Sequence, residues 1–170
     1  MIRLLHRIDG AARQSIPLAL ALLLVLLSAL PATLPVFREA APAWVFITVF
    51  YWSVYRPDLM PVQGAFAIGL LQDLLLGLPP GISALVYVAL RGSAGIIARH
   101  ATGRSFLKVW LLFVATAAAA SLARHLVMML WYEQLIDPTL AMVQLLLTVA
   151  AYPLAGWALA RLQKGLLAHV

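Results

Sequence analysis

The stretch GLLQDLLLGLPPGISAL, residues 69–85, contains two apolar segments joined by a Pro-Pro-Gly turn, with one carboxylate, Asp73, in the first segment. Proline and glycine end helices and favour tight turns, so the stretch predicts a helical hairpin that turns at Pro79, Pro80 and Gly81. A carboxylate is costly in an apolar environment unless a partner group meets it. The position of Asp73 therefore raises the question of which solvent and which partner surround it.

The composition indicates that much of the solvent is lipid. Of 170 residues, 64% are hydrophobic and only 11% are charged, whereas a soluble domain is nearer half apolar and a quarter charged. One core cannot bury such an excess, so the sequence predicts a single integral membrane domain over residues 1–170. We expect an all-α, polytopic bundle of membrane helices.

Six apolar segments are long enough, or nearly long enough, to cross a hydrocarbon core about 30 Å thick. The predicted spans are residues 16–36, 42–55, 61–78, 81–99, 107–131 and 138–162. The second segment is short and rich in aromatic residues, so an interfacial helix is the alternative for it.

The distribution of positive charge favours six spans over five. With six spans and both termini in the cytoplasm, nine of the 12 Lys and Arg residues lie on the inner side and Arg38 on the outer side. The inner residues are Arg3, Arg7, Arg13, Arg56, Arg99, Arg104, Lys108, Arg161 and Lys164. Positive residues accumulate on the cytoplasmic side of membrane proteins, so the sequence predicts an N-in, C-in topology in the bacterial cytoplasmic (inner) membrane.

An intramembrane polar cluster is expected from Asp73, Gln72, Arg91 and Arg124. Helix geometry places all four towards the outer half of the membrane, and the Arg91 side chain is expected to lean outward towards Asp73. The first interpretation is an ion pair that joins the third span to the fourth or fifth. The second is a site for a lipid head group, a substrate anion or an acidic residue of a partner, because two arginines outnumber one carboxylate.

Sequence patterns that would indicate catalysis or metal binding are missing. The chain has no cysteine, and it contains no HExxH, GxSxG or Walker pattern. An enzyme using Asp73 or His125 is a remote alternative, because no nucleophile–base couple accompanies them. We therefore expect a protein that is not an enzyme, with no cofactor and no metal, and no basic face suited to nucleic acid.

The run from Tyr51 to Leu85 resembles the rod shape-determining protein MreD family. The similarity consists of an aromatic-rich short helix, an arginine–proline loop and a GLLxDxLxGxPxGxxAL hairpin. The hairpin positions matched here are Gly69, Leu70, Leu71, Asp73, Leu75, Gly77, Pro79, Gly81, Ala84 and Leu85.

The resemblance implies a non-enzymatic subunit of the bacterial elongation machinery for lateral peptidoglycan synthesis. It implies direct binding to MreC, and through MreC indirect or transient association with the MreB filament and with a transpeptidase and a glycosyltransferase. It also implies the six-helix fold of substrate-binding subunits of energy-coupling-factor transporters. A small-molecule-binding subunit of a transporter is therefore the alternative function.

A partner interface of aromatic and small residues is expected, with the short second segment as one candidate. The aromatic candidates are Trp44, Phe50, Tyr51, Trp52 and Tyr55. The Gly- and Ala-rich helix surfaces are the other candidate, since small residues let helices approach closely.

Overall fold

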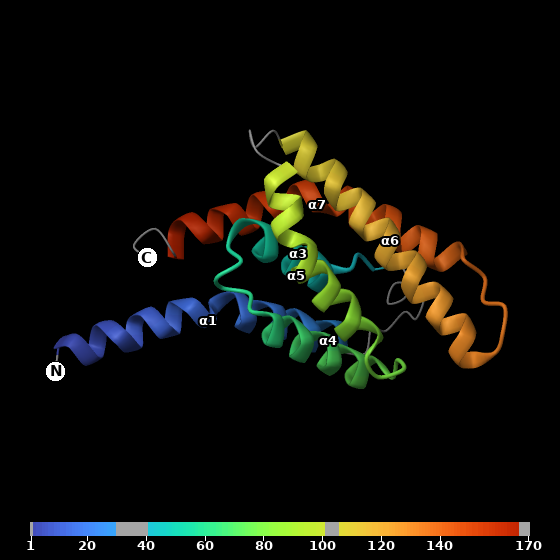
Figure 1. Cartoon of the computed structure of the whole chain (residues 1–170), viewed down its shortest axis with the longest axis horizontal. Helices are drawn as coiled ribbons and strands as arrows, with labels where there is room; N and C mark the ends of the chain where they lie inside the picture. The colour runs from blue at the N-terminus through green and yellow to red at the C-terminus, as the bar shows by residue number, and fades with distance from the viewer. Residues whose placement is uncertain (1, 30–40, 101–105, 167–170) are drawn as a thin grey trace.

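The computed structural model describes residues 2–29, 41–100 and 106–166, and describes side chains in 16–29, 41–94 and 106–165. Within these ranges the chain is all-helical (Figure 1). The helices are α1 (Ile2–Ala29), α3 (Trp44–Tyr55), α4 (Val62–Leu76), α5 (Ile82–His100), α6 (Phe106–Tyr132) and α7 (Thr139–Leu166).

The helices follow the expected segments closely, with one correction at α1. We expected the first helix to begin at Ile16, but it already begins at Ile2 and continues through Pro17. Leu4, Leu5 and Ile8 recur at helical spacing in the sequence, so the segment before Ile16 can form an amphipathic helix. The end of the expected first span, residues 30–36, and the outer residue Arg38 lie outside the described ranges.

Helix α3 is the centre of the bundle. It packs against α1, α5 and α7, and every residue from Val45 to Ser53 is buried. A helix that is apolar all round belongs in a core rather than at a surface. At 1.5 Å per residue its 12 residues measure about 18 Å, so α3 is much shorter than a bilayer core.

An aromatic cluster joins α3 to the later helices. The ring of Phe113 on α6 stacks on Tyr152 of α7 at 4.1 Å and meets the edge of Phe50 on α3 at 5.0 Å. Phe46 lies 5.9 Å from Phe113 and 6.3 Å from Tyr87 on α5. Offset and edge-to-face aromatic pairs add to the stabilisation that burial provides, so this cluster fixes the relative positions of four helices.

Two described helices are long and apolar enough to cross a membrane by themselves, namely α6 and, within α7, Thr139–Gly165. The remaining apolar stretches are shorter: Ile16–Ala29, Trp44–Tyr55, Val62–Leu76 and Ile82–Ala94. The surfaces of α6 and α7 expose many large apolar side chains, for example Leu130 at 79% and Leu146 at 67%. Large exposed apolar surfaces mark contact with lipid or with a partner, so a membrane helix bundle fits the fold.

Candidate functional site

The partners of the Asp73 carboxylate lie within the α4–α5 hairpin. The carboxylate is completely buried, and it accepts hydrogen bonds from the backbone N–H of Gly81 at 2.9 Å and of Ser83 at 3.0 and 3.1 Å. These groups lie at the start of α5, where helical N–H groups have no partner within the helix. Asp73 therefore caps α5 from the neighbouring helix, and its negative charge meets the positive end of the α5 dipole.

The backbone of Asp73 also ends α4. Its carbonyl accepts the N–H of Gly77, which adopts the left-handed conformation at φ 67°, and the N–H of Leu78 at 2.9 Å. Glycine adopts positive φ without steric cost and is the usual residue for this kind of helix end. One residue thus binds the end of α4 through its backbone and the start of α5 through its side chain.

Close backbone packing holds the two helices together below the turn. A Cβ atom added at Gly69 would lie 2.5 Å from the backbone of Ala84 and 2.7 Å from that of Ser83. Backbone atoms cannot move aside as flexible side chains can, so any larger residue at Gly69 would push α5 away from α4. Gly69 is therefore required by the packing of this structure.

The expected ion pair of Asp73 with Arg91 or Arg124 is wrong for this structure. Among the residues whose side chains are described, one ion pair is present, between Arg56 Nη2 and Asp58 Oδ2 at 3.0 Å. The Asp73 carboxylate has backbone N–H groups as partners, and each arginine donates elsewhere. The predicted cluster is thus divided among separate places in the fold.

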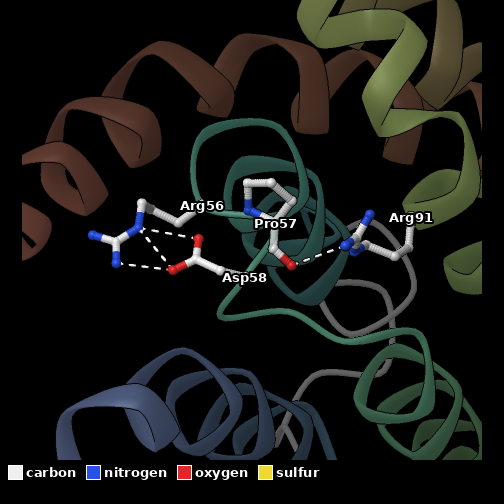
Figure 2. Close-up of polar contacts among 4 residues, drawn as sticks. All are labelled: Arg56, Pro57, Asp58 and Arg91. Carbon is white, nitrogen blue, oxygen red and sulfur yellow. Dashed lines mark hydrogen bonds and ion pairs between the residues drawn. The ribbon is translucent and has the colours of Figure 1, made fainter. Parts of the chain in front are cut away.

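Arg91 secures the α3–α4 loop (Figure 2). Its guanidinium donates to the backbone carbonyl of Pro57 at 2.9 Å, as Figure 2 shows, and also to that of Met60. The expected outward direction of this side chain is wrong, because α3 and α4 are short and their loop lies level with the middle of α5. The guanidinium extends to the polar loop instead, as long basic side chains in apolar surroundings commonly do.

Arg56 and Asp58 lie in the same loop (Figure 2). Arg56 donates to both carboxylate oxygens of Asp58 at 3.0 to 3.3 Å, and this hydrogen bonding lowers the pKa of Asp58 below its usual value. The pair is largely exposed, so its contribution to stability is small. Together the three charged residues make this loop polar and well connected.

Gln72 and Arg124 reach a common cavity between α3, α4, α5, α6 and α7. The Tyr87 hydroxyl donates to Gln72 Oε1 at 2.6 Å, and Arg124 Nη2 donates to Gln144 Oε1 at 2.7 Å. Gln144 Nε2 in turn donates to the Ala41 carbonyl at 3.1 Å. The lining residues are Ala43, Phe46, Gln72, Ser83, Val86, Tyr87, Ala117, Ala120, Ser121, Arg124, Gln144, Leu145 and Thr148.

Sequence reasoning missed Tyr87, Gln144 and Thr148 as members of this polar network. Thr148 Oγ1 accepts the backbone N–H of Ala43 at 2.9 Å and donates to the Gln144 carbonyl at 2.6 Å. An amide inside an otherwise apolar segment, such as Gln144, was the available signal, because such groups hydrogen-bond across membrane helices.

The aromatic partner interface expected on α3 is wrong for three of its members. Phe50, Tyr51 and Trp52 are buried within this chain, so they cannot receive a partner helix in this fold. Trp44 is 40% exposed and Tyr55 is half-buried. A partner role for these two stays a prediction.

Comparison with known proteins identifies the family. A family model for the rod shape-determining protein MreD matches residues 12–116, more than half of the chain. The chain belongs to the MreD family. The matched region contains the entire α4–α5 hairpin, together with Asp73 and Arg91.

A curated MreD-family relative supports this assignment. The rod shape-determining protein MreD of Haemophilus influenzae is 34% identical over 74 residues. The match covers 44% of this chain and 44% of that relative, so the aligned part is less than half of either MreD-family protein. No solved structure matches the chain, and the expected likeness to energy-coupling-factor subunits stays a prediction.

Proposed function

We propose that the chain is a multi-pass subunit of the bacterial inner membrane with six spans and both termini in the cytoplasm. Membership of the MreD family implies a role in rod-shape determination. The start of α1 and the end of α7 lie towards one side of the molecule, and the α4–α5 and α6–α7 connections lie towards the other (Figure 1). Lys164 near the α7 end and Asp137 in the α6–α7 connection fit the inner and outer sides of such a topology.

The proposed role is that of a non-enzymatic adaptor. The subunit binds MreC and, through it, helps couple MreB to lateral peptidoglycan synthesis by the transpeptidase and glycosyltransferase. Family membership is the observation that carries this proposal.

The exposed face of α6 is the proposed contact surface for MreC. Ala115, Ala119 and Ala123 recur at every fourth position and are all exposed. Small residues spaced in this way let two membrane helices approach closely, and association in lipid depends on such packing. Because other helices of the bundle surround α3, this Ala-rich surface is the better of the two candidates that the sequence suggested.

Co-purification with MreC in mild detergent tests the proposal. The wild-type chain is expected to retain MreC, whereas Ala119→Leu should lose it while staying monodisperse, because the larger side chain separates the helices. Ala150→Leu, an equally exposed change on α7, is the matched control and should retain MreC. Failure of the wild type to associate would contradict the adaptor role, and equal behaviour of the two variants would contradict the α6 surface.

A further inference from the structure

The cavity between α3, α4, α5, α6 and α7 has room for more than a single water molecule. Its volume is about 60 Å³, and one water needs about 10–15 Å³ on the same measure. Apolar side chains, including Phe46, Val86 and Ala120, form much of its wall. In such surroundings the charged and polar groups that face the cavity decide what it can hold.

Arg124 alone carries a charge among the lining residues that the structure describes. A guanidinium has five N–H donors, and the structure gives Arg124 one hydrogen bond, from Nη2 to Gln144. Asp73, which lies on α4 nearby, has its carboxylate on the N–H groups of α5. The positive charge of Arg124 is therefore not neutralised by an ion pair within the described chain.

Gln72, on α4, adds a second donor to the cavity lining. Its Oε1 already accepts the Tyr87 hydroxyl, which leaves the amide nitrogen as the free end of this side chain. That nitrogen has no hydrogen-bond partner among the described residues. The described side-chain atoms that are both buried and without a partner do not include it, so it borders open space. Two neutral hydroxyls, from Ser83 and Ser121, complete a lining rich in donors.

We propose that this cavity binds an oxyanion of the phosphate or carboxylate type, held by Arg124 and Gln72. Arginine binds both kinds of oxyanion through paired N–H donors, and these charge-assisted bonds are stronger in apolar surroundings. The oxyanion belongs either to the head group of a lipid or to a free solute, since both present the same chemistry. The proposal does not depend on MreC binding.

Binding to the purified chain without MreC tests the proposal. Native mass spectrometry with added phosphatidylglycerol measures the lipid source, and calorimetry with sodium phosphate and with sodium succinate measures the solute source. Three variants are compared. Arg124→Gln removes the charge, Arg124→Lys keeps it, and Ala120→Leu fills the cavity. Arg161→Gln is the matched control, because it removes an arginine that lies over Trp157 at the other end of α7.

The wild type and Arg161→Gln should bind at least one probe with equal affinity. Arg124→Gln should bind it about tenfold or more weakly, as expected for the loss of a charged hydrogen bond, and Arg124→Lys should be intermediate. Ala120→Leu should also bind it more weakly, because the larger side chain occupies the cavity. Binding of lipid alone or of solute alone would each support the proposal and identify the source. Absence of binding to all three probes, or wild-type affinity in a folded Arg124→Gln variant, would overturn it.

Discussion

The buried carboxylate of Asp73 accepts the backbone N–H of Ser83 at 3.0 to 3.1 Å, so a side chain of α4 caps the start of α5. Gly81, which precedes α5, has no side chain that could do this locally. The hairpin of the MreD-family pattern is therefore closed by one residue acting on both helices. Its aspartate is explained by helix geometry and needs no cationic partner.

Replacing Asp73 should destabilise the hairpin. Asp73→Ala leaves the buried N–H of Ser83 and the partly buried N–H of Gly81 without partners, which we expect to cost about 2 kcal/mol or more of unfolding free energy. Asp73→Asn keeps one acceptor oxygen and should cost less. Asp137→Ala removes an exposed aspartate that accepts the Thr139 N–H at 2.9 Å, and this matched control should have a smaller effect.

Thermal unfolding in detergent, read by intrinsic fluorescence, measures these differences. The expected order of stability is wild type, Asp137→Ala, Asp73→Asn and then Asp73→Ala. If Asp73→Ala were as stable as Asp137→Ala, the buried cap would not contribute to stability as the geometry requires.

Substitution at Gly69 should separate α4 from α5. Gly69→Ala places a Cβ atom within 2.5 Å of the Ala84 backbone, and overpacking of this kind costs about 1–3 kcal/mol. Gly92→Ala on α5 meets no atom within 4 Å and should be neutral or stabilising, because alanine favours helix more than glycine does. Chemical denaturation of both variants checks the prediction, which a stable Gly69→Ala protein would refute.

Labelling of single cysteines distinguishes six spans from five. The chain has no cysteine, so Asp58→Cys and Asp137→Cys each introduce one thiol without further changes. With six spans, a membrane-impermeant maleimide added to spheroplasts should label Asp137→Cys and spare Asp58→Cys. If α3 did not cross the membrane, the α3–α4 loop would lie outside and the α6–α7 loop inside, which reverses the labelling.

Loss of Arg91 should loosen the α3–α4 loop. Arg91→Gln cannot reach both the Pro57 and Met60 carbonyls, so amide hydrogen exchange in residues 56–65 should become faster. The matched control is Arg161→Gln, which removes the same charge from α7 and should leave exchange in this loop unchanged. Equal exchange in the wild type and Arg91→Gln would show that these contacts do not hold the loop.

Much of the helix pattern could be predicted from the sequence, because apolar segments and their Pro and Gly boundaries define the helices directly. The predicted 61–78 and the observed Val62–Leu76 differ by one or two residues at each end. The beginning of α1 was missed because the expected span was defined by the apolar run that begins at Ile16, whereas the helix also includes the polar residues before it. Membrane crossing by the shorter helices stays a prediction.

The partners of the charged residues were harder to predict. Charge complementarity suggested that Asp73 would meet an arginine. The backbone N–H groups at a helix start also bind carboxylates, but the residue types in the sequence do not indicate them. Gly81 at the start of α5 was the available signal, because a glycine there cannot cap its own helix. The direction of Arg91 depends on the depth of the α3–α4 loop, which follows from packing around α3.

The most direct test of the account is the amide signal of Ser83 in NMR spectra of the wild type and Asp73→Asn in detergent. A hydrogen bond to a carboxylate should give the wild-type Ser83 amide a downfield proton shift and slow exchange, and both should diminish in the variant. The guanidinium signals of Arg91 and Arg124 should stay unchanged. An unaltered Ser83 amide together with a shifted arginine signal would contradict the cap and restore the ion pair.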